Sequence, residues 1–273
     1  MQLAQGQVCV VVPAYRAALG PGETMALQQC CKVLGRYPMV LAQPQSLDSS
    51  RLMSEFGLST AEKFEDRHFA SVASYNDWLL TPEFYARFSA YQYILIHQLD
   101  AFVFRDELSE WCARGYDYIG APWMDARALS SGLALRRLLF KRWLYQKLEK
   151  KDRDGVSPHP AWYRFGVGNG GFSLRRVQAM IDVLRQLAGE LAQLRGSGKL
   201  PNEDLFYGLM ANRRGAALNI PGYATAAGFA IEFCPARSVQ LLNGGRLPFG
   251  CHAFDKHEPD YWRAVFATYG YQL

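Results

Sequence analysis

The sequence has no long apolar run and no Cys-x-x-Cys pair. Its apolar stretches are much shorter than the roughly 20 residues that a membrane-spanning helix needs. The first residues lack the charged start and the long apolar stretch of a signal peptide. The six cysteines are scattered along the chain, which argues against a disulfide framework or a zinc knuckle. We therefore expect a cytoplasmic protein whose cysteines are small buried side chains.

Surplus positive charge is confined to one segment. The net charge is +5, but residues 135–153 hold eight basic and two acidic side chains, so the remainder is close to neutral. No nucleic-acid-binding motif accompanies the charge, which argues against a nucleic acid partner. The segment suits an anionic membrane surface or a phosphorylated acceptor, which would place the protein peripherally at the inner face of a membrane. Its apolar residues are spread around the helical wheel, which also fits a solvated helical insertion.

Short apolar runs alternate with helical patterns. Residues 8–12 form a β-branched run stopped by Pro13, typical of a buried strand, and residues 23–35 place apolar side chains on one helical face. Further strands are expected at residues 39–42, 93–104, 116–119, 218–220 and 229–233, and a long helix at 177–196. This alternation predicts an α/β fold with a mainly parallel sheet flanked by helices. We expect a single domain over residues 1–273, with a basic helical insertion around residues 130–160.

Asp100 is the one carboxylate in the largely apolar residues 93–104. A carboxylate at the tip of a buried strand either pairs with a nearby Arg, caps a turn, or takes part in chemistry. Four motifs follow one another along the chain: Gln98-Leu99-Asp100-Ala101-Phe102, Tyr118-Ile119-Gly120-Ala121-Pro122-Trp123, Asn169-Gly170-Gly171-Phe172-Ser173-Leu174-Arg175 and Glu203-Asp204. Together they resemble glycosyltransferases of the GT-A type, and more narrowly a glycosyltransferase-like family defined as a domain of unknown function. The resemblance covers roughly residues 8–262 and implies a GT-A-like, Rossmann-like fold.

The resemblance implies a site for a nucleotide sugar and a divalent cation. Asp100 occupies the last position of the Asp-x-Asp metal motif, whereas Gln98 stands where the first acid is expected. His252 corresponds to the late histidine that binds the same cation in many such enzymes. Oxygen ligands suit Mg²⁺ or Mn²⁺, and imidazole favours Mn²⁺. A core histidine is the alternative interpretation of His252.

By the same resemblance, Asp204, with Glu203 in reserve, is the general base of an inverting transfer. The Asn-Glu-Asp run also has a structural explanation, because Asn202 is a good N-cap and acids stabilise the first turn of a helix. The remaining donor-binding candidates lie in two loops. The glycine-rich loop contributes Asn169, Gly170, Gly171 and Ser173, with Arg175 as a phosphate contact, and the loop after the first strand contributes Pro13, Tyr15 and Arg16. Tyr15 is expected to stack on uracil.

These expectations define an inverting glycosyltransferase of the hexosyl- or N-acetylhexosaminyltransferase class, with a UDP-sugar as the expected donor. The acceptor would be a hydroxyl of a glycan or lipid-linked glycan, as in polysaccharide biosynthesis. A retaining glycosyltransferase is the nearest alternative. Because fold does not guarantee activity, a non-catalytic carbohydrate-binding module on a degenerate GT-A fold is another, and Gln98 favours it. A metal hydrolase that uses Asp100 and His252 is a third possibility, but the sequence lacks the dense His and Asp clustering that such sites show.

Overall fold

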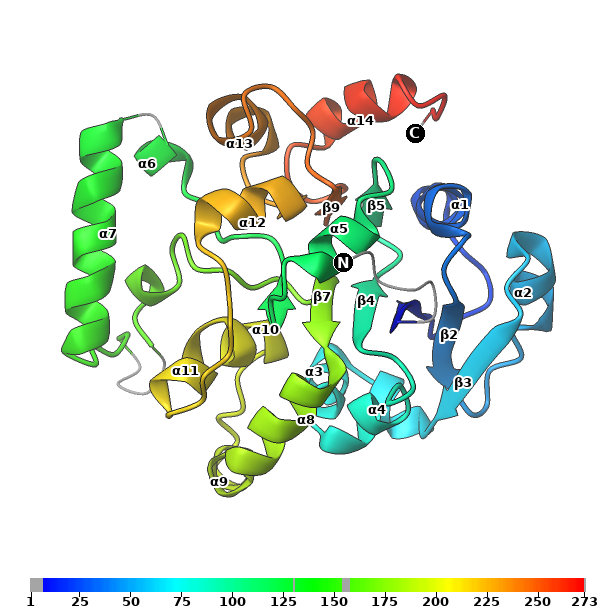
Figure 1. Cartoon of the computed structure of the whole chain (residues 1–273), viewed down its shortest axis with the longest axis horizontal. Helices are drawn as coiled ribbons and strands as arrows, with labels where there is room; N and C mark the ends of the chain where they lie inside the picture. Colours follow the sequence, from blue (N-terminus) through cyan, green and yellow to red (C-terminus); the bar gives the residue numbers. More distant parts are fainter. Residues whose placement is uncertain (1–6, 130, 154–157, 273) are drawn as a thin grey trace.

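A six-stranded sheet forms the centre of the computed structural model, which describes residues 7–129, 131–153 and 158–272 (Figure 1). The strands lie in the order β3-β2-β1-β4-β7-β6, and the first four run parallel. β7 is antiparallel to both of its neighbours. The mainly parallel sheet expected from the sequence is thereby confirmed, with these bounds: β1 (Val8–Pro13), β2 (Met39–Pro44), β3 (Thr60–Phe64), β4 (Tyr93–His97), β6 (Tyr118–Ile119) and β7 (Phe172–Arg176).

The sheet separates two apolar cores. Alternate residues of β1 enter different cores: Val8, Val10 and Val12 pack on one side, and Cys9 and Val11 pack on the other. A strand buried on both faces reads as a continuous β-branched run, because neither face is left for polar residues. The sequence of β1 follows from this double burial.

Helices cover both faces. The side of Val10 is packed by α1 (Pro21–Leu34), α2 (Ser50–Phe56), α5 (Leu108–Ala113) and α12 (Tyr223–Phe229). The side of Val11 is packed by α3 (Val72–Trp78), α4 (Pro82–Ala86), α8 (Val177–Gln186), α9 (Ala188–Gly196), the π-helical segment η4 (Phe206–Met210) and α11 (Ala211–Arg213). The short α10 (Glu203–Leu205) leads directly into η4, and η2 (Asp66–Phe69) precedes α3.

A second, three-stranded sheet stands at the carboxyl end of β4. Its order is β5 (Ala101–Val103), β9 (Gly250–His252) and β8 (Ala230–Ile231). β5 is antiparallel to β9, and their register pairs Ala101 with His252. A third core of Phe102, Cys251, Trp262 and Phe266 joins this sheet to α14 (Pro259–Ala267). The small sheet therefore fixes residue 252 beside the turn that follows β4.

The remaining helices are α6 (Ala126–Leu129), α7 (Gly132–Lys147), η3 (Pro160–Trp162) and α13 (Pro235–Leu242). Residues of α6 and α7 pack together around Phe165 in a fourth, smaller core. α7 stands at the left edge of Figure 1, well away from the central strands. Across residues 7–129, 131–153 and 158–272, none of the helices combines the length and the apolar character needed to cross a bilayer.

Two expectations about secondary structure are wrong. Residues 218–220 form no strand, because the Asn212 side chain holds both backbone groups of Leu218, and Asp117 accepts from the Asn219 backbone. The helix expected over residues 177–196 is two helices that meet at Leu187. The strands at residues 8–12 and 39–42 and the helix at 23–35 are confirmed within one or two residues.

Candidate active site

A cavity of about 1100 Å³ opens at the carboxyl ends of β1 and β4. This edge of an α/β sheet is where ligands bind, because the loops that follow parallel strands meet there. Four segments that the sequence analysis singled out line it: residues 13–16, 98–100, 169–171 and 202–204. The antiparallel β7 brings the third segment here, since its start lies beside the end of β4 and the Gln98 amide donates to the Gly171 carbonyl at 2.8 Å.

Three candidate ligand side chains converge at the end of β4. The His252 Nε2 atom lies 3.1 Å from Asp100 Oδ1 and 3.1 Å from Gln98 Oε1. Gly171 packs directly against them, since a Cβ there would lie 2.0 Å from His252 Nε2 and 2.6 Å from Gln98 Oε1. The glycine thus leaves room for the cluster. The structure brings together the two residues that the sequence analysis named as metal ligands.

The cluster fits a divalent cation in its donor chemistry. A carboxylate, an amide oxygen and an imidazole nitrogen suit Mn²⁺ better than Mg²⁺. Among the residues that the structure describes, no group of three or more His, Cys, Asp and Glu is arranged to hold a metal. The amide of Gln98 would therefore have to serve as the third protein ligand, where the resembled family supplies an acid.

Charged neighbours shift the pKa values of Asp100 and His252. Lys256 Nζ lies 3.0 Å from Asp100 Oδ2. Burial disfavours the Asp100 carboxylate, but His252 and Lys256 outweigh burial and hold its pKa below the ordinary value. Burial also disfavours a charged His252, whereas the nearby carboxylates of Asp100 and Glu232 raise the pKa of the imidazole to about 9. Without a cation, His252 is thus the positive member of the cluster.

Glu232 and Lys256 are site residues that the sequence analysis missed. Glu232 follows β8, lies 3.8 Å from His252 Nδ1 and accepts a hydrogen bond from the Asn169 side chain. It therefore connects the glycine-rich loop to the imidazole and orients both. The signal that marked Asp100, an acid at the end of an apolar run, is also present at Glu232. Lys256 had no such local signal.

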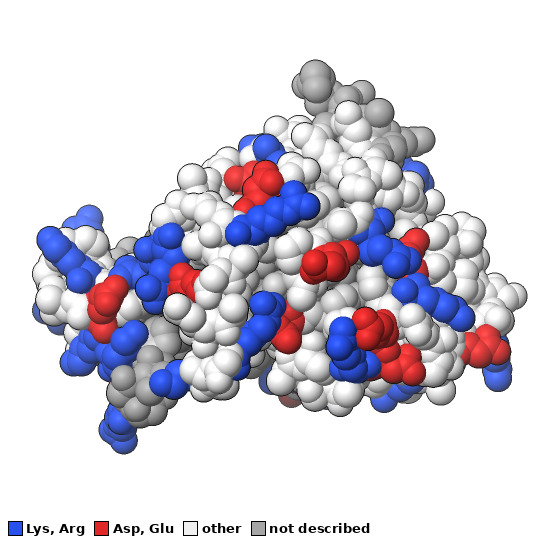
Figure 2. All heavy atoms as spheres, turned by 90° about the horizontal axis from the view of Figure 1, so that it is seen from below, with Lys and Arg blue, Asp and Glu red and all other residues white. Residues whose placement is uncertain are grey.

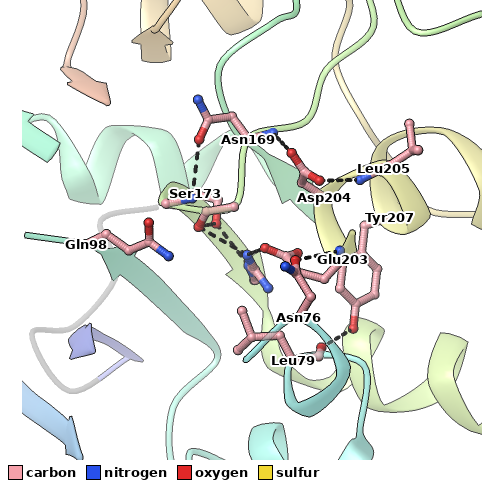
Figure 3. A network of polar contacts seen from close by, with 12 residues as sticks. Asn76, Leu79, Gln98, Asn169, Ser173, Glu203, Asp204, Leu205 and Tyr207 are labelled. Carbon is pink, nitrogen blue, oxygen red and sulfur yellow. Dashed lines mark hydrogen bonds and ion pairs between the residues drawn. The ribbon is translucent and has the colours of Figure 1, made fainter. Parts of the chain in front are cut away.

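Asp204 faces the glycine-rich loop from the start of α10 (Figure 3). Its Oδ2 accepts from the Asn169 amide at 3.1 Å, and its Oδ1 accepts from the Leu205 amide at 2.7 Å. Burial raises the pKa of Asp204, while these two amides limit the rise. The Asn202 side chain makes no capping hydrogen bond, so the structural explanation of the Asn-Glu-Asp run is incomplete.

Glu203 is buried under the same loop. Its Oε1 pairs with Arg175 Nη2 at 2.9 Å, and a Cβ on Gly170 would lie 1.6 Å from that oxygen. Its backbone amide donates to Asn76 Oδ1 (Figure 3). Burial raises the pKa of Glu203 to about 7, and the Arg175 guanidinium limits that rise. Gly170 and Gly171 therefore adjoin two different clusters, the first at Glu203 and the second at His252.

Ser173 and Arg175 do not reach the cavity, which corrects the expectation that they contact the donor. Both are 0% exposed. The Arg175 guanidinium donates to Ser173 Oγ, Tyr85 Oη, the Gly170 carbonyl and Glu203. Because the guanidinium is fully buried and makes these four hydrogen bonds, it holds the loop and Glu203 together and does not face a phosphate in the cavity.

The loop after β1 forms another wall of the cavity. Pro13, Tyr15 and Arg16 all line it, and the Tyr15 ring is largely exposed. Arg16 binds the Glu23 carboxylate through two contacts of 2.8 Å, and Glu23 also accepts from the Gly20 amide at the start of α1. Trp123 lines the cavity as well. Two aromatic side chains and the Arg16 guanidinium thus line the cavity.

The central sheet carries this cavity at the ends of its parallel strands. The crystal structure of mouse xyloside xylosyltransferase 1 has the same fold with a TM-score of 0.51 and 12% identity, over 89% of this chain and 96% of that one. Core-mannan synthase A of Aspergillus fumigatus scores 0.47 with 11% identity, over 78% of this chain and 72% of that one. The expected GT-A-like fold is confirmed.

The chain belongs to the family described as a protein of unknown function, DUF5672, whose model matches residues 59–252. That span contains β4, the glycine-rich loop, the acid pair and His252. No curated protein matches the chain.

Proposed function

We propose that this protein is an inverting glycosyltransferase that moves a sugar from a nucleotide sugar, a UDP-sugar by preference, to a hydroxyl of a glycan or lipid-linked glycan. One observation carries the proposal. Gly170 lies against Glu203, and the adjacent Gly171 lies against Gln98 and His252, so the acid pair and the candidate metal ligands share one cavity. The likeness of the fold to that of a xylosyltransferase supports it. We also propose that residues 1–273 form one catalytic unit.

The donor would bind along the wall from Tyr15 to Asp100. Tyr15 would stack on the base, and Arg16 and Lys256 would contact the diphosphate. Asp100, His252 and Gln98 would hold Mn²⁺ or Mg²⁺. A bound cation neutralises charge that develops on a diphosphate leaving group. The sugar would lie beside Asn169, Gly170 and Gly171, close enough to hydrogen-bond with the backbone of this loop.

Asp204 is the proposed general base. It would remove the proton from the acceptor hydroxyl as that oxygen attacks the anomeric carbon. The carbon–oxygen bond to the diphosphate breaks on the opposite face, so the configuration of the sugar is inverted and the nucleoside diphosphate leaves. The two backbone amides on Asp204 fix its orientation. Glu203, paired with Arg175, would help to hold the glycine-rich loop in place.

The first test is binding and turnover with a panel of nucleotides and nucleotide sugars. A shift in melting temperature with UDP and Mn²⁺, larger than with either alone, is the expected result. Transfer to a glycan acceptor should then give a product whose anomeric configuration, read by NMR, is opposite to that of the donor. A product that keeps the donor configuration would establish a retaining enzyme instead.

A non-catalytic carbohydrate-binding module remains the second candidate, because Gln98 stands in place of an acid and the cluster contains one carboxylate. Such a module would bind glycan without any response to nucleotides. Absence of a stabilising effect across uridine, guanosine, adenosine and cytidine diphosphates would exclude the transferase and favour this candidate.

A further inference from the structure

α7 exposes an unusual outer face. It carries the exposed apolar side chains of Leu133 (60% exposed), Phe140 (61%) and Trp143 (53%). Leu148, directly after the helix, is 66% exposed. Only three other large apolar side chains within the described residues are exposed to this degree: Tyr15, Val72 and Leu241. Solvated helices normally turn charged residues outward, so this face is poorly suited to water alone.

Basic residues share the same face. Arg136, Arg137, Lys141 and Lys147 are all exposed, and residues 132–147 contain no acid. At about 100° per residue, the four apolar and four basic side chains fall within an arc of about 160°. No acidic side chain of the described segments pairs with these four cations. Figure 2 shows Lys and Arg gathered at the left end of the molecule, which α7 occupies in Figure 1.

The opposite face of α7 attaches the helix to the protein. Leu135, Leu138 and Leu139 pack against the core around Phe165. Arg142 donates to the Phe165 carbonyl at 2.8 Å. This inward packing explains why apolar residues appear all around the helical wheel: one set holds the helix, and the other is left exposed. The outer face is therefore not needed for folding.

We propose that the outer face of α7 binds an anionic lipid bilayer. Exposed Phe and Trp insert at the boundary between headgroups and acyl chains, and Lys and Arg are attracted to acidic headgroups. The charge of the face is complementary to such a surface, and the mixture of aromatic and basic side chains is the composition of interfacial helices. A protein partner with a purely acidic surface would leave the apolar residues unmatched.

The same helix connects the bilayer to the cavity. Phe165, to which Arg142 donates, begins the segment that runs through Gly166 and Gly168 to Asn169. Gln146 also donates to the Trp162 carbonyl at 2.6 Å. The bilayer-bound face and the loop beside the acceptor thus belong to one continuous packed unit, which would keep the cavity near a lipid-linked acceptor. Binding to the bilayer does not depend on the proposed glycosyl transfer.

The test is cosedimentation with vesicles of phosphatidylcholine, with and without phosphatidylglycerol. Wild-type protein should bind the anionic vesicles and release them in high salt. The Arg136→Ser/Arg137→Ser variant should bind roughly 25-fold more weakly, at about fivefold per cation. Phe140→Ser/Trp143→Ser should lose on the order of tenfold or more. Arg67→Ser/Arg185→Ser and Leu241→Ser, which alter exposed residues elsewhere, should bind like the wild type.

Brominated lipids add a readout specific to one residue. They should quench part of the tryptophan fluorescence of the wild type and much less of it in Trp143→Phe, which keeps an aromatic anchor. Equal binding to neutral and anionic vesicles, or equal losses in the control variants, would overturn the proposal. Self-association abolished by Phe140→Ser/Trp143→Ser, without vesicle binding, would also overturn it and identify a contact between copies. Melting temperature and UDP binding, measured on every variant, separate these outcomes from misfolding and from failure of the proposed transfer.

Discussion

Replacing Arg175 by Met should lower the free energy of unfolding by about 3–5 kcal/mol, the cost of removing one partner of a buried ion pair. The partner is Glu203, and the side chains of Arg175 and Glu203 are only 0% and 4% exposed. The change removes hydrogen bonds to Ser173, Tyr85, Gly170 and Glu203, and a charged hydrogen bond contributes about 1.5–3 kcal/mol. The apolar Met side chain recovers part of the loss.

Protonation of Glu203 limits the damage. Burial already raises its pKa to about 7, so the carboxyl left without Arg175 can become neutral at little cost near pH 7. The destabilisation should therefore be smaller at pH 5 than at pH 8. Urea unfolding followed by circular dichroism at both pH values measures this difference.

The matched control is Arg67→Met, which breaks the exposed Arg67–Glu65 pair. Exposed pairs contribute about 1 kcal/mol or less, so this variant should unfold almost like the wild type. A loss below about 1 kcal/mol in Arg175→Met would refute the reasoning. So would unchanged stability with strongly weakened UDP binding, because that pattern would return Arg175 to the phosphate.

Three further predictions concern the site. Asp204→Asn should lower kcat by roughly 10²- to 10⁴-fold with little change in KM for the donor, measured with saturating acceptor; a variant with near-normal kcat would exclude Asp204 as the base. Gly171→Ala should weaken Mn²⁺ binding roughly 10- to 100-fold, measured by calorimetry, because its Cβ would displace His252 and Gln98. Gly189→Ala in α9, where a Cβ meets nothing within 4 Å, should leave binding unchanged and stabilise by up to about 1 kcal/mol. Glu203 has a pKa of about 7 in the folded chain against an ordinary 4.5, so the folded state keeps its proton longer. The stability that this provides is complete below pH 4.5 and is lost as the pH rises through 7; Glu203→Gln should flatten this decline, and an unchanged pH profile would contradict it.

Local patterns predicted much of the central fold. The β-branched run of β1 and the apolar stripe of α1 are visible within a dozen residues, because double burial and one-sided packing each leave a short-range signature. The segment 218–220 is as apolar as a strand, but side chains of Asn212 and Asp117 satisfy its backbone instead of a neighbouring strand. That competition is not visible in the apolar pattern.

The site was harder to predict than the sheet. Gln98 and His252 are 154 residues apart and meet only because β5 pairs with β9, and no periodicity records a long-range pairing. Arg175 was misplaced for a related reason. Its position on β7 points it into a covered face of the sheet, whereas its residue type alone indicates solvent or phosphate. Glu232 has the local signal of an acid after an apolar run, whereas Lys256 reaches the site only through the path of the chain after β9.

The pairing of Ala101 with His252 also has a consequence for the order of assembly. The strands of the large sheet are all complete by Arg176, whereas the imidazole that faces Asp100 belongs to β9, which comes later in the sequence. During synthesis, every strand of the large sheet would therefore leave the ribosome before the ligand cluster can form. Because side chains alternate along a strand, a slip of one residue between β5 and β9 would turn His252 away from Asp100. Three residue pairs between β5 and β9 thus determine whether the ligand cluster can form, and a chain misregistered there would keep its large sheet but lack the cluster.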